Sequence, residues 1–326
     1  MGVVMNRIRR WAAFSALLAL PMGLGCAGFW NTGTTPTSTG TTPTNTGNFA
    51  YATSSYSSSS TTAYTLTGFS VGTGTLTRLS GFPLTLPFAP TATAINPANT
   101  YLYVGGTGGI RGYVISSTGG LKQITNGSNP ALATANVVSM DISPDGKWLF
   151  GLDIDIDGVT IDEFQIQSGG VLSSVTGASY TVSNGQPVVP SSIRVSQNAK
   201  SLYVAAALGT GGDLLYVLDT STGALTLANR VTPTTISSAD QAVAFDSSGA
   251  TLYVARSGTD AGLIPYAIGT GSTLTAVSGA PYAAGSGPSL TIGPPPYTVS
   301  PGPSSIELDA TGIVRRRNAR SFVRLV

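Results

Sequence analysis

Three aspartates spaced two residues apart form a candidate metal site. Asp153, Asp155 and Asp157 alternate with isoleucines and are followed by Gly158. Ca²⁺ takes several oxygens from one tight turn, and calcium-binding loops begin with carboxylates at this spacing. The spacing therefore predicts a calcium site, although Phe164 stands where such a loop has its closing glutamate.

The same segment also fits a β-hairpin that binds no metal. Its turn would contain Asp157 and Gly158, because Asp-Gly is favoured in two-residue hairpin turns. The alternation of side chains along a strand would then turn the acids to water. The side chains facing inwards would be Ile154, Ile156, Val159 and Ile161.

A second candidate site consists of three charged residues, each inside a short apolar, strand-like segment. They are Asp141, Arg194 and Glu307. If these strands line a common channel at a similar height, the side chains would form a polar ring suited to a small anion or a sugar. The alternative is that Arg194 pairs with Asp141 or Glu307 between neighbouring strands, because unpaired buried charge is costly.

Most nucleophilic and metal chemistry is excluded by composition. The chain has no histidine and one cysteine, Cys26, so it has no disulfide, no histidine-ligated metal and no Ser-His or Cys-His pair. The segment Gly68-Phe69-Ser70-Val71-Gly72 matches the nucleophile-elbow pattern, but no histidine is present to take the serine proton. We expect no catalytic residue of that kind, and no cofactor other than the calcium ion.

The charge distribution argues against nucleic acid as a partner. The formal net charge is +2, but eight of the 16 basic residues lie in the first ten or the last twelve residues. The body of the chain then has eight basic residues against 14 acidic ones, a balance of −6. A surface that follows phosphates needs the opposite sign.

The elements that must position these residues form a repeat. Each copy has an apolar strand, a polar turn and an aromatic strand such as Leu202-Tyr203-Val204. The aromatic positions 51, 103, 150, 203 and 253 are 52, 47, 53 and 50 residues apart. Each copy continues with a second aromatic strand, a Gly turn and a leucine, which is typical of an antiparallel hairpin. The sequence therefore predicts an all-β chain of five four-stranded blades, a β-propeller.

The ends of the repeat predict how the ring closes. The first unit lacks its inner strand, and Ser305 to Gly312 has the pattern of an inner strand and turn without a partner. The two chain ends could therefore share one blade, as is common in propellers. The predicted boundaries are a signal at 1–26, a Thr/Gly/Pro-rich tether at 27–47, the repeats at 48–312 and a basic tail at 313–326.

The repeat resembles the YVTN-type and lactonase-type propellers, which include 6-phosphogluconolactonase-like proteins. The resemblance lies in Leu202-Tyr203-Val204-Ala205, in Leu252-Tyr253-Val254-Ala255 and in the turn Ser143-Pro144-Asp145-Gly146. It implies a propeller fold and, more weakly, lactone hydrolysis. Such propellers typically have seven blades, so this chain is interpreted as a truncated relative; the alternative is a five-bladed ring with a basic tail.

The N-terminus predicts export and lipidation. Basic residues precede an apolar segment, 11–20, that is too short for a comfortable membrane span. The segment Gly23-Leu24-Gly25-Cys26 resembles a lipobox, whose cysteine receives diacylglycerol, although Gly23 stands where the motif usually has an aliphatic residue. An ordinary secretory signal and an uncleaved anchor are the alternatives. All three place the domain outside the cytoplasm, at the cell envelope.

Two functions are consistent with these patterns. The first is a membrane-tethered binding or scaffolding module, a monomer that binds a glycan, a peptide or another envelope protein. The second, implied by the resemblance, is a lactone hydrolase in which Asp or Glu would have to act as the base. The segment 276–303, rich in proline, is the predicted location of specificity because functional residues of such folds lie on loops.

Overall fold

The computed structural model is all-β, as the composition predicts. It describes residues 48–57, 61–73, 75–155, 158–182, 190–196, 202–207, 213–219, 224–231, 238–258, 261–282, 290–292, 297–299, 303–308 and 314–318. The only helical turns in this part of the chain are two 3₁₀ turns, η1 (Ser168–Gly170) and η2 (Thr270–Ser272). Within the same ranges, no helix has the length and apolar character needed to cross a membrane.

Twenty of the strands form five antiparallel sheets of four strands each. Blade 1 contains β1 (Phe49–Ser57), β2 (Thr62–Gly72), β3 (Thr75–Arg78) and β4 (Leu84–Leu86). Blade 2 contains β5 (Pro90–Ile95), β6 (Tyr101–Gly106), β7 (Gly109–Ile115) and β8 (Leu121–Gln123). Blade 3 contains β9 (Val137–Ile142), β10 (Trp148–Asp155), β11 (Gly158–Ile166) and β12 (Leu172–Val182).

Blade 4 contains β13 (Ser192–Val195), β14 (Leu202–Ala207), β15 (Asp213–Asp219) and β16 (Ala224–Val231). Blade 5 contains β17 (Ala239–Phe245), β18 (Thr251–Ser257), β19 (Gly262–Ile268) and β20 (Leu274–Ala276). Two further two-stranded sheets are formed by β21 (Leu290–Ile292) with β22 (Tyr297–Val299), and by β23 (Pro303–Leu308) with β24 (Val314–Asn318).

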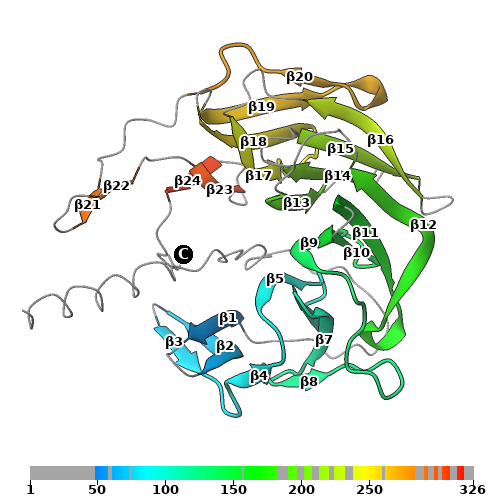
Figure 1. The fold of residues 1–326 in the computed structure, drawn as a ribbon, viewed down its shortest axis with the longest axis vertical. Helices are drawn as coiled ribbons and strands as arrows, with labels where there is room; N and C mark the ends of the chain where they lie inside the picture. Colours follow the sequence, from blue (N-terminus) through cyan, green and yellow to red (C-terminus); the bar gives the residue numbers. More distant parts are fainter. Residues whose placement is uncertain are drawn as a thin grey trace, which may run out of the picture.

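The five sheets stand around a common centre, with the first strand of blades 2 to 5 innermost (Figure 1). Neighbouring inner strands contact one another, β5 with β9, β9 with β13, and β13 with β17. This arrangement is a β-propeller, and it confirms the fold predicted from the repeat. One sheet cannot bury both of its faces alone, which is why the blades pack side by side.

The core lies between the blades rather than within one of them. One cluster joins blades 1 and 2 and includes the buried residues Tyr51, Leu66 and Val104. A second joins blades 2 and 3 and includes Met140 and Phe164. The aromatic positions of the repeat therefore fill the spaces between sheets.

Two of these aromatics also tie neighbouring blades together by hydrogen bonds. The Tyr51 hydroxyl of blade 1 donates to the Gly119 carbonyl of blade 2 at 2.8 Å. The Tyr103 hydroxyl of blade 2 donates to the Gly170 carbonyl of blade 3 at 2.9 Å. The repeat thus carries an inter-blade bond between its first aromatic and the next blade's Gly turn, with Phe150 as the blade 3 counterpart that lacks a hydroxyl.

In blades 2 and 5, the first two strands are joined by a short turn with satisfied polar groups. In blade 2 the Asn96 Oδ1 atom accepts from the amides of Thr100 and Tyr101, both at 2.8 Å. In blade 5 the Asp246 Oδ1 atom accepts from the amides of residues 250 and 251. Side chains that bond to the backbone a few residues on favour such tight turns.

The chain ends do not share a blade in the described residues, which corrects that expectation. β1 pairs with β2 and has no inner strand beside it, whereas β23 pairs with β24 and contacts β17 and β18 of blade 5. β23 therefore occupies the position after blade 5 rather than the inner position of blade 1. The reason is that Val314–Asn318, within the predicted basic tail, forms a strand that supplies its partner.

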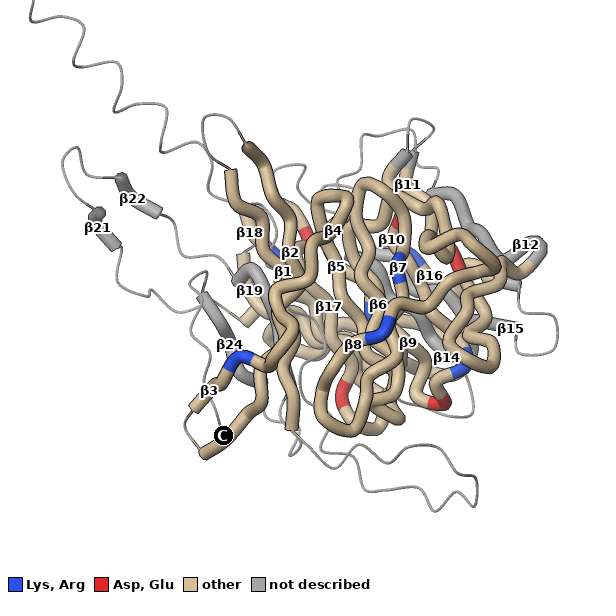
Figure 2. The backbone as a smooth tube through the Cα atoms, turned by 90° about the horizontal axis from the view of Figure 1, so that it is seen from below, with Lys and Arg blue, Asp and Glu red and all other residues tan. Residues whose placement is uncertain are grey.

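Charged side chains are sparse along the described backbone. Figure 2 shows few Lys, Arg, Asp and Glu positions on a tube that is otherwise uncharged. Only 9% of the whole chain is charged. Any charged group that the fold buries therefore stands out as a candidate for function.

Candidate functional site

The two ends of the blades differ in the connections that they carry. We call the end where β5, β9, β13 and β17 begin the strand-start rim. The opposite end carries the tight turns described for blades 2, 3 and 5. The connection between blades 2 and 3, residues 124–136, leads to the strand-start rim. Longer and more varied loops over a rigid frame are where binding residues are usually found.

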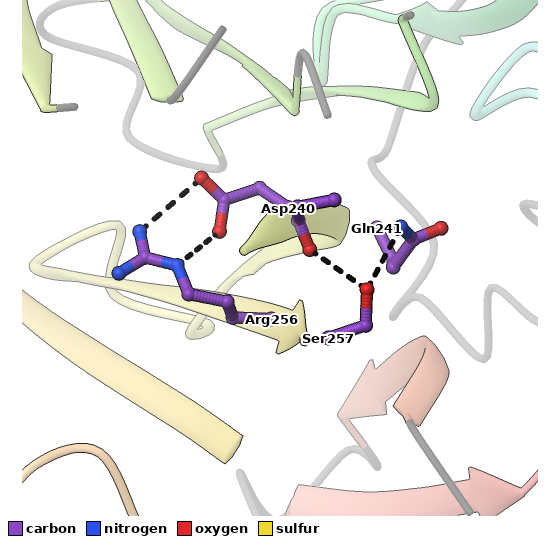
Figure 3. Close-up of polar contacts among 5 residues, drawn as sticks. Asp240, Gln241, Arg256 and Ser257 are labelled. Carbon is purple, nitrogen blue, oxygen red and sulfur yellow. Dashed lines mark hydrogen bonds and ion pairs between the residues drawn. The ribbon is translucent and has the colours of Figure 1, made fainter. Parts of the chain in front are cut away.

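A buried ion pair stands at this rim in blade 5. The Arg256 Nε atom of β18 donates to Asp240 Oδ1 of β17 at 2.7 Å, and its Nη2 atom donates to Oδ2 at 3.2 Å (Figure 3). The two side chains are 7% and 0% exposed, respectively. Two parallel bonds between a guanidinium and a carboxylate fix the geometry of both groups. The pair is thus a buried, charge-compensated contact at a fixed place at the start of β17.

An amide and a hydroxyl extend the polar group next to the ion pair. Gln241 Nε2 donates to Ser257 Oγ at 3.1 Å, and Ser257 Oγ donates to the Ala239 carbonyl at 3.2 Å (Figure 3). From blade 4, the Ser191 hydroxyl donates to the Gln241 carbonyl at 2.5 Å. We call Asp240, Gln241, Arg256 and Ser257 the rim cluster.

The rim cluster was not predicted from the sequence because its two halves, residues 240–241 and 256–257, lie on different strands. Asp240 and Arg256 are 16 residues apart and meet because the β17–β18 register pairs them directly. A register shift follows between Asp240 and Ala242. The signal that could have identified them is the position of a charge at the start of an otherwise apolar inner strand, with an opposite charge at the end of the next strand.

The predicted ring residues are placed separately by the structure. Asp141 Oδ2 accepts from the Val195 amide of the next blade at 2.8 Å, and Oδ1 accepts from the Ile142 amide at 2.9 Å. Burial raises the pKa of Asp141, whereas Arg194 and these two amides act in the opposite direction. Arg194 Nη1 donates to the Ile193 carbonyl at 2.7 Å. Glu307 lies in β23, and its side chain is outside the described residues.

Asp141 therefore joins blades 3 and 4, with Arg194 nearby as a favourable charge. Ser139 also joins the two blades, because its Oγ atom accepts a hydrogen bond from the Ile193 amide at 3.2 Å. These contacts join the two blades but do not include the pairing of Arg194 with Asp141 or Glu307 that the alternative predicts. The ring and that pairing both stay predictions, and the Glu307 side chain lies outside the described residues.

The three aspartates of the calcium prediction lie at a hairpin. β10 and β11 pair up to Asp155 and Gly158, so the hairpin is confirmed, while Asp157 and the Asp155 side chain are outside the described residues. Asp153 is 9% exposed and its Oδ1 atom accepts from the Asn136 amide at 2.7 Å. No group of three or more acidic or cysteine side chains suited to a metal occurs in the described ranges. Calcium binding remains a prediction.

Two details of the hairpin interpretation were wrong. Asp153 is buried rather than turned to water, because the Asn136 amide satisfies it. Ile154 is 36% exposed rather than inward, because it lies beyond Val137, the first residue of β9, and that strand does not cover it.

Glu163 of β11 is a second residue that was not predicted from the sequence. Its side chain is 2% exposed, and both carboxylate oxygens are buried without a hydrogen-bond partner. Burial raises the pKa of Glu163 to about 8. The signal was present in the alternation of the strand, which puts Glu163 on the same face as Ile161.

The segment predicted to carry specificity begins at the strand-start rim. Tyr282 pairs with Leu263 of β19 through two backbone hydrogen bonds of 2.9 Å, and its side chain is 41% exposed. This bridge brings the first part of segment 276–303 back over blade 5, beside the rim cluster.

Comparison with known proteins supports the fold. No protein-family model matches the sequence, and no curated protein is significantly similar to it. Among solved structures, the periplasmic gluconolactonase PpgL of Pseudomonas aeruginosa superposes with a TM-score of 0.57 at 18% identity, over 78% of this chain and 70% of that one. The chain shares the β-propeller fold of this protein.

Two further structures agree with this propeller. A 6-phosphogluconolactonase candidate from Bacteroides uniformis gives a TM-score of 0.56 at 20% identity, over 81% of this chain and 72% of that one. A protein from Lactobacillus plantarum gives 0.55 at 20% identity, over 70% and 67%. Identities this low show a shared propeller and leave the chemistry to be argued from the site.

Proposed function

We propose that this propeller is a ligand-binding module held outside the cytoplasm by a lipid on Cys26, and that it binds a small hydroxylated molecule, a sugar or sugar acid, at the rim cluster. The observation that supports this most is that the start of β17 and the end of β18 bring a guanidinium–carboxylate pair, the amide of Gln241 and the hydroxyl of Ser257 to one rim of blade 5. A few convergent polar groups on a rigid frame are what orients a small polar ligand.

Binding of gluconate and glucono-lactone to the full chain tests the proposal. We expect saturable heat in titration calorimetry, and about fivefold weaker binding in Gln241→Ala, because one lost hydrogen bond amounts to about 1 kcal/mol. Ser248→Ala, in a tight turn at the opposite end of blade 5, is the matched control and should bind normally. Equal affinities of the Gln241→Ala and Ser248→Ala variants for the ligand would contradict binding at the rim cluster.

Lactone hydrolysis is a second candidate, favoured by the structural likeness to the gluconolactonase. A hydrolase needs a base, and without histidine only a carboxylate could serve. The rate of acid release from glucono-lactone, measured at several protein concentrations, distinguishes the two functions. Saturable turnover would favour the hydrolase, whereas binding without turnover would favour the binding module.

The lipid anchor is tested by Cys26→Ala in the full chain. The wild-type protein is expected in the membrane fraction of a bacterial host, and the variant in the soluble envelope fraction, because a diacylglycerol-bearing cysteine would be the only membrane attachment. Metabolic labelling with a radioactive fatty acid should mark the wild type alone. A variant that stays in the membrane fraction would show an uncleaved N-terminal anchor instead.

A further inference from the structure

The face of blade 3 that meets blade 4 contains a carboxyl group that no part of the proposed function uses. The β9–β10 and β10–β11 registers place Asp141, Phe150 and Glu163 directly opposite one another, in a row across three strands. Asp141 bonds to the Val195 amide of β13, so the row faces blade 4. Phe164, on the other face, packs with residues of blade 2.

The backbone around Glu163 is irregular. β11 pairs Asp162 with Ser179 but pairs Phe164 with Ser174, so four residues of β12 stand opposite the single position of Glu163. Bulges of this kind interrupt the ladder and re-aim a side chain. The result is a carboxyl group aimed between two blades at the point where its own sheet is least regular.

The two carboxyl groups in the row differ in their hydrogen-bond partners and in the charges near them. Asp141 accepts hydrogen bonds from two backbone amides and has Arg194 nearby. Glu163 has no hydrogen-bond partner, and burial alone acts on its pKa. The ionisable groups on the elements packed around Glu163 are Asp141 on β9, Asp153 and Asp155 on β10, Asp162 on β11, Tyr180 on β12, Arg194 on β13, Tyr203 on β14, Asp213, Tyr216 and Asp219 on β15, and Arg230 on β16.

We propose that the joint between blades 3 and 4 is a pH-sensitive switch in which protonated Glu163 keeps this face of blade 3 packed against blade 4 and ionised Glu163 releases it. A carboxylate buried without a partner is far more costly than a neutral carboxyl group. The protonated group can remain where it is, whereas the ionised group gains by reaching water. Opening of this joint therefore provides the route by which Glu163 loses its proton.

The direction of the pH effect follows from the pKa of Glu163, which burial raises from 4.5 to about 8. The folded joint then holds a proton that the opened joint gives up at any pH above 4.5. The stabilisation is complete below pH 4.5, decreases as pH rises from there, and is lost as pH passes through about 8. Each pH unit inside this window changes the opening equilibrium about tenfold.

Amide hydrogen exchange of the full chain at pH 5.5 and 7.5, corrected for intrinsic rates, tests the switch. Protection of β11 and β12 is expected to fall about 100-fold between the two pH values, and that of blade 1 to change much less. Glu163→Gln cannot ionise, so its protection should be nearly independent of pH. Asp145→Asn is the matched control: the pKa of Asp145 is lowered, chiefly by its bonds to Ser143 and Lys147, so it should keep the wild-type response.

Equal pH responses of wild type and Glu163→Gln would overturn the switch. If Glu163→Gln does not fold, Glu163→Leu supplies the same comparison, because neither side chain titrates. An infrared spectrum of the wild-type chain at pH 6.5 gives an independent check. A protonated-carboxyl band that disappears in the variant supports the proposal, and a wild-type spectrum without such a band contradicts it.

Discussion

Asp240→Ala is expected to lower the free energy of unfolding by about 3–5 kcal/mol. The substitution leaves the Arg256 guanidinium buried without the carboxylate that accepts two of its bonds. Breaking a buried pair by removing one partner has a cost of this size, because the remaining buried charge loses its bidentate carboxylate. Urea denaturation followed by circular dichroism, with the slope compared between variants, measures it.

The ion pair has a natural control on the surface of the same protein. Lys147 and Asp145 are 3.3 Å apart, but their side chains are 69% and 47% exposed. Asp145→Ala should change stability by no more than about 1 kcal/mol, because exposed pairs contribute little. The double replacement Asp240→Leu with Arg256→Met should recover most of the loss, since an apolar pair leaves no charge buried. Similar losses in Asp240→Ala and Asp145→Ala would show that burial of the pair is not decisive.

Gly109→Ala is expected to cost about 2–5 kcal/mol of stability. Gly109 begins β7 with φ of +103°, and an added Cβ would lie 2.3 Å from the Ala133 carbonyl oxygen. That oxygen accepts a 2.9 Å bond from the Ile110 amide, so it cannot move away without breaking a bond between β7 and the segment before β9. Strain at positive φ contributes about 1–2 kcal/mol and the close contact about 1–3 kcal/mol.

Gly127→Ala separates these two contributions. Gly127 has φ of +62°, and a Cβ there would meet no atom within 4 Å. Its loss should be limited to about 1–2 kcal/mol from backbone strain. Thermal and urea unfolding of both variants measure the two losses of stability. If Gly109→Ala loses no more stability than Gly127→Ala, the Ala133 carbonyl can move away at little cost.

Much of the fold could be predicted from the sequence because it depends on local patterns that repeat. Alternation of apolar and polar residues predicts the strands, Gly and Asp predict the turns, and a period near 50 residues predicts a four-stranded blade. Tyr51, Tyr103 and Phe150 are each 2% exposed or less, as repeated aromatics between packed sheets should be. A pattern with these features predicts sheets that pack side by side around a common centre.

The candidate site could be predicted only in part, because each of its residues depends on a partner from another strand. Asp153 followed the alternation that predicts an exposed acid, yet the amide of Asn136 allows it to be buried. Asp141 was recognised as a charge on an inner strand, but its bond to the Val195 amide depends on how blade 4 lies beside blade 3. No local pattern contains that information.

The sequence by itself determined the all-β class, the five blades and the turns that join their strands, because these follow from contacts between residues near one another in the chain. Tertiary structure alone decided which charges became buried and with what partners. Arg256 obtained a carboxylate through the β17–β18 register, whereas Glu163 obtained none, at a bulge between two blades. The physical reason is that the energy of a buried charge is set by the few groups within hydrogen-bonding distance, and those groups are brought there by packing rather than by spacing along the chain.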